Sequence, residues 1–216
     1  MASALQFPVD QAALVEALDS VQRAALVKRE ELACFTLRQL PPLIQMMHNN
    51  KIVHCDIKTE NIMIGSNKEL YLIDLGMASP FGMPVHGGTY TFLPSDVLLG
   101  LSGKVLMPAA ASPAVDCFSL GMVLYHVLTG GQRRHAYLAP ELYQRWHEQG
   151  QDLVLLAALM HEEERVLWPQ EVFNLVSPAL LDLVEGLLSR REGARTKMQE
   201  VGLRKNAYMR EWPLDD

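Results

Sequence analysis

The chain has 216 residues, which is enough to bury roughly 70% of its unfolded surface around a core of its own. Apolar residues make up 49% and charged residues 20%, the balance of an ordinary globular protein. The formal net charge of −6 argues against a nucleic-acid-binding protein, because such proteins usually carry a basic excess. The cysteines are scattered and neither C-x-x-C nor H-E-x-x-H occurs, so no metalloenzyme signature is present.

The sequence predicts an intracellular location. Residues 1–11 lack the basic start and apolar run of a signal peptide. The longest apolar run, around residues 121–128, is far shorter than a membrane span. Scattered cysteines fit a reducing compartment. We therefore expect a cytoplasmic or nuclear protein with neither a membrane nor a nucleic acid as its partner.

Two helical segments are expected before residue 50. Apolar residues recur at helical spacing over residues 10–29, with Asp10 as the N-cap. A second helical pattern covers residues 32–47. Pro41 and Pro42 interrupt it, and since proline removes a helical hydrogen bond, we expect a kink or a restart there.

The pattern changes after residue 50. Short apolar, β-branched segments at 52–54, 62–64 and 70–73 predict strands, and the turn residues 65–68 join the last two as a hairpin. Residues 81–103 are rich in glycine and proline and have no stable period, so they predict an irregular loop.

The remainder is predicted to be helical. Ser112-Pro113 opens a helix that ends at Gly130-Gly131, and Pro140 opens another that stops near Gly150. Residues 153–168 form a strong helical stretch, and Ser177-Pro178 opens one more helix. The expected fold is therefore mainly α with a small β-hairpin sheet.

The most informative motif lies at residues 54–61, which read HCDIKTEN, and residues 74–76 read DLG, with Asp74 13 residues after Asn61. Phosphoryl transfer from ATP needs a carboxylate to orient the attacking hydroxyl, ligands for Mg²⁺ and a cation for the developing charge. Asp56, then Asn61 with Asp74, and Lys58 are the residues that fit these needs.

These residues resemble the large, C-terminal lobe of eukaryotic-type protein kinases of the Ser/Thr type, in which the two motifs read H-R-D-L-x-x-x-N and D-F-G. Residues 88–96 resemble the end of the family's activation segment. Residues 116–121 resemble the start of its central helix, and Arg195 stands where the family places an arginine that pairs with that segment. The motifs occur in the family's order and cover nearly the whole chain.

The resemblance implies a protein Ser/Thr kinase that uses ATP and Mg²⁺ and acts on protein Ser or Thr hydroxyls. It implies the following roles: Asp56 as catalytic base, Lys58 as catalytic and ATP-binding cation, Asn61 and Asp74 as metal ligands, Met63 under adenine, and Thr89 bound to the catalytic Asp in the substrate-binding segment. It implies framework roles for His54, Gly76, Asp96, Asp116 and Arg195, with a largely buried Arg195–Asp96 ion pair. Gly76 would permit the backbone conformation that lets Asp74 turn into the site.

The sequence departs from the family in two places. Cys55 replaces the arginine that in many members pairs with a phosphorylated activation loop, so no such phosphorylation is expected to be required. No Gly-rich loop and no V-A-I-K lysine is present, and residues 1–9 are at most a hinge remnant. We therefore expect residues 1–216 to form a single lobe, with the site in 50–96 and a helical subdomain in 112–205. A partner polypeptide would cover its exposed apolar upper face around Ile62, Met63 and Leu75.

Two alternatives remain. The first is a non-catalytic, kinase-like scaffold that binds a partner through the uncovered face, which the missing phosphate clamp favours. The second is a small-molecule phosphotransferase of the antibiotic- or choline-kinase type, which also carries H-x-D-x-x-x-x-N. It is disfavoured because it would lack Thr89, the Asp96–Arg195 pair and the helix start at Asp116.

Overall fold

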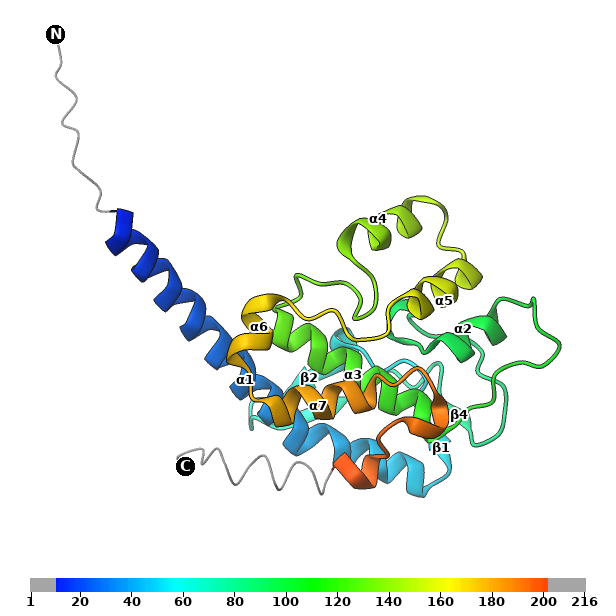
Figure 1. Ribbon diagram of the computed structural model, residues 1–216. Helices are drawn as coiled ribbons and strands as arrows, with labels where there is room; N and C mark the ends of the chain where they lie inside the picture. Colours follow the sequence, from blue (N-terminus) through cyan, green and yellow to red (C-terminus); the bar gives the residue numbers. More distant parts are fainter. Residues whose placement is uncertain (1–10, 202–216) are drawn as a thin grey trace, which may run out of the picture.

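A computed structural model describes the backbone of residues 11–201 and the side chains from residue 22 to residue 201. The expected cap Asp10 and the hinge remnant at residues 1–9 lie outside the described residues. In this range the protein forms a mainly helical lobe with two small antiparallel sheets, which confirms the predicted fold class (Figure 1).

Helix α1 (Gln11–Asn49) is one continuous helix of 39 residues, and its first turns extend away from the rest of the lobe (Figure 1). The expected division near residue 30 and the expected restart at the prolines are therefore wrong, because Pro41 and Pro42 lie inside the helix. The physical reason is packing on both sides of the prolines. Leu37, Leu40 and Ile44 are almost completely buried, and α1 packs against α3 (Pro113–Thr129). This burial offsets the hydrogen bonds that the prolines cannot make.

The two sheets position the candidate site. Strand β1 (Ile52–Val53) pairs with β4 (Ser79–Pro80), and β2 (Ile62–Ile64) pairs with β3 (Leu70–Leu72). The second pair is the predicted hairpin, in which Lys68 donates its N–H to the carbonyl of Gly65 at 3.0 Å across the turn. All four strands are short, so each depends on the helices behind it for stability.

The segment predicted to be an irregular loop contains two helical elements, the 3-10 helix η2 (Tyr90–Phe92) and α2 (Ser95–Leu101). The prediction of a loop was wrong here because α2 is too short to show a period. Its helical state follows from tertiary contacts: Val97 and Leu98 are buried, and α2 packs against α5 (Leu153–Glu162).

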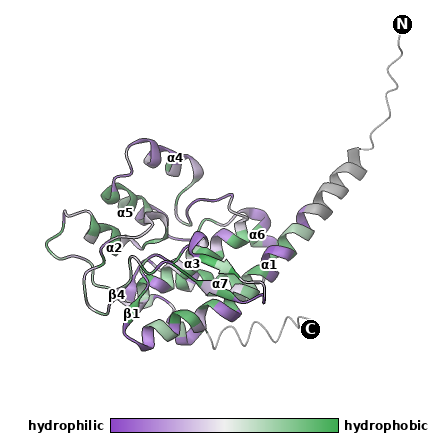
Figure 2. Ribbon diagram, turned by 180° about the vertical axis from the view of Figure 1, so that it is seen from behind, coloured by the Kyte–Doolittle hydropathy of each residue, from purple (hydrophilic) through white to green (hydrophobic). Residues whose placement is uncertain are grey.

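The C-terminal helices follow their predicted start signals. Helix α3 (Pro113–Thr129) begins after Ser112 and ends at Gly130, whose φ of +63° is the left-handed conformation that glycine adopts without strain. Helix α4 (Pro140–Glu148) and helix α7 (Pro178–Leu187) also begin at the predicted prolines. Figure 2 shows α4 as mostly hydrophilic, in line with its position at the surface.

Helix α5 ends earlier than predicted, at Glu162 instead of residue 168. The residues after it are extended because they pair with another segment. Leu167 donates its N–H to the carbonyl of Ala136 at 2.8 Å, and its own carbonyl accepts the Tyr125 hydroxyl at 2.8 Å. The short helices α6 (Gln170–Leu175) and η3 (Glu192–Ala194) were not predicted.

Helix α3 forms the centre of the lobe, with α1 and α7 packed against it (Figure 1). Gly121 allows α3 and α7 to approach closely, because a Cβ atom at this position would lie 2.9 Å from Cγ of Leu188. In residues 11–201, no helix is both long and apolar enough to cross a bilayer.

Candidate functional site

The loop that connects β1 to β2 is held by one buried carboxylate. Asp116, in the first turn of α3, accepts the N–H of His54 at 2.9 Å through one oxygen and the N–H of Cys55 at 3.0 Å through the other. Cys55 has a φ of +64°, a conformation that costs energy for a residue with a side chain. Since Asp116 is fully buried, its two hydrogen bonds are strong enough to hold this turn in place.

The turn places Asp56 at the centre of a polar cluster. One carboxylate oxygen, Oδ1, accepts both the N–H and the hydroxyl of Thr89, each at 2.8 Å. The other oxygen lies 3.0 Å from Nζ of Lys58 and 3.1 Å from Nδ2 of Asn61. Lys58 also donates to the Thr89 hydroxyl at 2.9 Å, which closes a triangle of hydrogen bonds.

This cluster keeps Asp56 ionised. Burial by itself would raise the pKa of Asp56, since only 7% of the residue is exposed. The hydrogen bonds from Thr89 and Lys58, together with the charge of Lys58, outweigh burial and hold the pKa below its ordinary value. At neutral pH Asp56 is therefore a fixed acceptor that can orient a hydroxyl.

Asn61 is oriented by the same cluster. Its Nδ2 donates to the backbone carbonyl of Asp56 at 2.8 Å as well as to the Asp56 carboxylate. Within residues 22–201, no hydrogen bond reaches its Oδ1, so this amide oxygen is left as a potential metal ligand.

Asp74 lies beside Asn61 because the two segments are joined through their backbones. The N–H of Ile73 donates to the carbonyl of Asn61 at 2.9 Å, and Asp74 follows directly. Asp74 has a φ of +64° and an exposed side chain, and its Oδ1 accepts the N–H of Gly76 at 3.1 Å. An amide oxygen and a carboxylate from adjacent segments are hard ligands of the kind that Mg²⁺ prefers, so these residues fit that ion.

The structure corrects the reason given for Gly76. The sequence suggested that Gly76 supplies the unusual backbone conformation, but the left-handed residue is Asp74 itself. Gly76 instead allows a close approach, because a Cβ atom there would lie 3.1 Å from Oδ1 of Asp74. Its contribution is an N–H donor that orients the carboxylate.

His54 links the two halves of the site. Its ring is fully buried, and Nδ1 accepts the N–H of Asp56 at 3.3 Å. Nε2 therefore carries the proton and donates to the carbonyl of Ile73 at 3.2 Å, one residue before Asp74. The histidine thus ties the loop of Asp56 to the segment of Asp74 without facing solvent.

Met63 lies on an exposed apolar surface above the site. Met63 is 55% exposed and Leu75 is 60% exposed, and Ile64, Tyr71 and Ile73 are also exposed. We call these five residues the upper face. Ile62, which the sequence suggested as a further member, is only partly exposed and packs on the core instead.

Arg195 and Asp96 are in contact, with Nη2 of the arginine 2.8 Å from Oδ1 of the aspartate. The pair is less buried than expected: the side chain of Arg195 is 1% exposed, but that of Asp96 is 43% exposed. Arg195 also donates to the carbonyls of Ser189 at 2.8 Å and Arg190 at 3.1 Å. The buried guanidinium therefore has partners besides Asp96.

Two supporting residues were missed by sequence reasoning. Nε2 of His48 lies 2.8 Å from the Asp116 carboxylate, and the Ser119 hydroxyl donates to the carbonyl of Phe92 at 2.8 Å. Each joins elements that are distant in the chain, since His48 and Asp116 are 68 residues apart. No local pattern marks such a pair.

Comparison with known proteins agrees with this geometry. A family model described as "Protein kinase domain" matches residues 9–206. A "probable serine/threonine-protein kinase" of Dictyostelium discoideum is 34% identical over 105 residues, which cover 47% of this chain and 19% of that protein. "Probable cyclin-dependent kinase 10" of the same organism is 34% identical over 105 residues, 48% of this chain and 27% of the relative. "Sperm motility kinase Z" of Mus musculus is 30% identical over 115 residues, 51% and 21% respectively. The chain thus spans about a fifth to a quarter of these relatives.

Proposed function

The chain belongs to the protein kinase domain family, and from this premise we propose that it is the catalytic lobe of a protein serine/threonine kinase. In this function the γ-phosphate of ATP is transferred to the hydroxyl of a Ser or Thr in a protein substrate. The observation that carries the proposal is the ionised Asp56, held by Thr89, Lys58 and Asn61.

Each of these residues has a defined task in the proposed reaction. Asp56 accepts a hydrogen bond from the substrate hydroxyl and orients it for in-line attack. Lys58, whose ammonium group is already beside Asp56, faces the incoming phosphate with a positive charge. Thr89 fixes the carboxylate, so that little reorganisation is needed when the substrate arrives.

Asn61 and Asp74 would hold Mg²⁺, which neutralises charge on the phosphates when it is bound. The support for this assignment is the donor set. The Asn61 amide nitrogen is engaged by Asp56, which leaves the amide oxygen for a metal. Asp74 is oriented by the N–H of Gly76. We therefore expect Asp74→Asn to abolish metal-dependent nucleotide binding.

Phosphate transfer from radiolabelled ATP to casein, at millimolar Mg·ATP, tests the proposal directly. Asp56→Asn keeps the shape of the side chain but removes its charge, so turnover should fall by about 100-fold or more. Asp182→Asn is the matched control, because Asp182 is exposed and lies on α7 away from the site. Equal transfer by the wild type and Asp56→Asn would show that Asp56 is not catalytic.

A second candidate function is a non-catalytic scaffold that binds a partner polypeptide through the upper face. The observation that favours it is the exposure of the large apolar side chains of Met63, Ile64, Tyr71 and Leu75, because exposed apolar surface often marks an interaction site. A chain with no detectable phosphate transfer, but whose Met63→Lys/Leu75→Lys variant loses a partner bound by the wild type, would support this alternative.

A further inference from the structure

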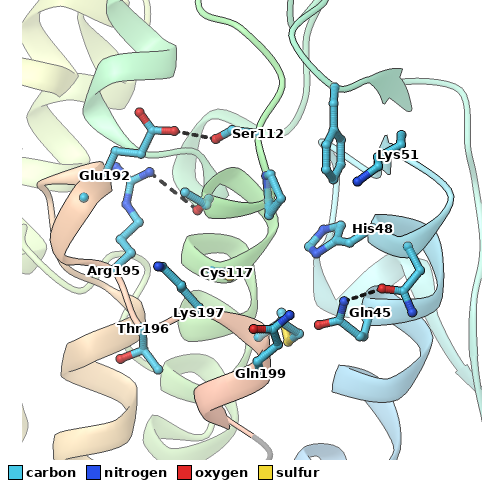
Figure 3. A pocket seen from close by; sticks show the side chains of 16 residues that line it. Gln45, His48, Lys51, Ser112, Cys117, Glu192, Arg195, Thr196, Lys197 and Gln199 are labelled. Carbon is cyan, nitrogen blue, oxygen red and sulfur yellow. Dashed lines mark hydrogen bonds between the residues drawn. The ribbon is translucent and has the colours of Figure 1, made fainter.

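A second pocket contains none of the residues around the Asp56 carboxylate, but it includes His48 and Arg195, which support the site from outside. It has a volume of about 790 Å³ and is formed by the end of α1, the start of α3 and residues 192–199. Figure 3 shows His48 and Lys51 on one wall and Arg195 and Lys197 on the other. A volume of this size falls in the usual range for small-molecule sites, roughly 300–1,000 Å³.

The charges around the pocket are unbalanced. Arg195 is paired with Asp96, and the Glu192 carboxylate accepts the hydroxyl of Ser112 at 2.5 Å but keeps its negative charge. Among residues 22–201, neither Lys51 nor Lys197 has an ion-pair partner, and both are exposed at the pocket. Lys51 and Lys197 outnumber the one carboxylate of the lining, Glu192, so the pocket carries a net positive charge in a chain whose net charge is −6.

Part of the remaining lining is apolar, beside polar side chains such as Gln45 and Gln199. Met198 and Cys117 are buried, and Phe81 stands beside Lys51, whose Nζ is 5.5 Å from the ring centroid. Burial raises the pKa of the Cys117 thiol to about 12, so this sulfur contributes apolar surface and no nucleophile. The pocket thus combines an apolar floor with cationic sides, the features that fix the orientation of an amphiphilic anion.

We propose that this pocket is a binding site for a small organic anion, with its acidic group at Lys51 and Lys197 and its apolar body against Phe81 and Met198. The site is connected to the catalytic loop by hydrogen bonds. His48 forms part of the pocket wall, and its Nε2 lies 2.8 Å from the Asp116 carboxylate that holds the N–H groups of His54 and Cys55. An occupant that contacts His48 therefore displaces the support of the turn before Asp56.

Methyl NMR on the full chain of 216 residues tests the proposal without any measurement of activity. Methionine methyl groups are labelled with ¹³C, the Met198 signal is assigned from the Met198→Leu spectrum, and naphthalene-2-carboxylate is titrated. We expect a saturable shift of Met198 with a dissociation constant below about 1 mM. We also expect the amide signals of His54 and Cys55 to move in parallel. A naphthalene of the same shape that carries an aminomethyl cation should leave Met198 unmoved.

Two double variants distinguish binding in this pocket from a general effect of removing positive charge from the protein. Lys51→Gln with Lys197→Gln should weaken the carboxylate by about fivefold or more, because both cations are removed. Lys28→Gln with Lys68→Gln is the control, since these lysines are also exposed and Lys68 shares the positive φ of Lys51. Three results would each overturn the proposal. The first is no shift of the Met198 signal up to roughly 5 mM naphthalene-2-carboxylate, a limit set by its solubility. The second is an unchanged affinity in the Lys51/Lys197 variant, and the third is a shift confined to Met63 on the upper face.

Discussion

Thr89 donates both its backbone N–H and its hydroxyl to the same carboxylate oxygen of Asp56, each at a distance of 2.8 Å. The backbone N–H remains when Thr89 is replaced by valine, whereas the hydroxyl is lost. A substitution at Thr89 can therefore remove one hydrogen bond to the Asp56 carboxylate while the backbone hydrogen bond still holds the activation segment in position.

Thr89→Val tests the hydroxyl alone, since valine has nearly the same shape. A hydrogen bond to a charged group contributes about 1.5–3 kcal/mol, so turnover should fall about 10- to 100-fold while the fold is retained. The pKa of Asp56 should rise as well, which would move the acidic limb of the pH–rate profile upward.

Steady-state kinetics and a melting curve check this prediction. Thr91→Val is the control, because Thr91 lies in the same segment and makes no hydrogen bond through its hydroxyl to residues 22–201. A Thr89→Val protein with wild-type turnover would show that the hydroxyl does not orient Asp56.

We expect the Arg195–Asp96 pair to affect stability more than turnover. Arg195→Ala removes a buried guanidinium that also donates to the carbonyl of Ser189 and stacks 5.6 Å from the ring centroid of Phe118. Loss of one partner from a buried pair typically costs about 3–5 kcal/mol. Because Asp96 is half exposed and can be hydrated, most of this cost comes from the groups that surrounded the arginine.

Urea unfolding measures the change in the free energy of unfolding. Arg191→Ala provides the control, since Arg191 is exposed and its substitution should cost no more than about 0.5 kcal/mol. If Arg195→Ala unfolds at the wild-type urea concentration, the pair does not stabilise the lobe.

The sequence predicted those elements whose signals are local. Ser112-Pro113 and Gly130 mark the ends of α3 through capping, and the hairpin of β2 and β3 follows from its turn residues. By contrast, α2 forms because Val97 and Leu98 are buried against α5, and α1 remains whole because packing outweighs two prolines. Such tertiary effects leave no trace in a short window of sequence.

The candidate site shows the same division. Asp56, Lys58, Asn61 and Asp74 were identified from motif spacing, and the structure brings Asp56, Lys58 and Asn61 into direct contact. The part played by His48 was not predicted, because its bond to Asp116 spans 68 residues and depends on how α1 meets α3. Spacing can identify reactive groups, but their supports are set by packing.

Buried His135 should make the free energy of unfolding depend on pH. Its ring is fully buried, Nδ1 accepts the N–H of Tyr137 at 3.1 Å, and Nε2 has no partner among residues 22–201. Burial, with a smaller effect from the neighbouring His126, lowers the pKa of His135 to about 3. The folded protein therefore favours the neutral ring.

The sign of the pH effect follows from linkage. A histidine with a lowered folded pKa stabilises the fold fully above its unfolded value of about 6.5, and this stability is lost as the pH falls from 6.5 toward 3. Its slope should approach about 1.4 kcal/mol per pH unit. His135→Leu should show a flatter decline in the free energy of unfolding between pH 6.5 and pH 4.5, and parallel curves for both proteins would contradict this prediction.

Nucleotide affinity tests how much of the ATP site these 216 residues supply. Among the described residues, the proposed metal ligands are Asn61 and Asp74, and the proposed apolar floor is Met63, which is 55% exposed. The sequence contains no Gly-rich loop and no strand lysine to hold the phosphates. Each missing charge-assisted hydrogen bond is worth about 1.5–3 kcal/mol, so loss of two or three should weaken ATP on the order of 10³-fold.

We therefore expect the chain alone to bind Mg·ATP only at millimolar concentration and to gain affinity when a second polypeptide covers the upper face. Titration calorimetry of the isolated monomer is the measurement. Asp74→Asn serves as the control, because whatever binding remains should depend on the metal ligand. Micromolar affinity in the wild-type monomer would refute the prediction, since it would require phosphate contacts beyond the floor formed by Asn61, Met63 and Asp74.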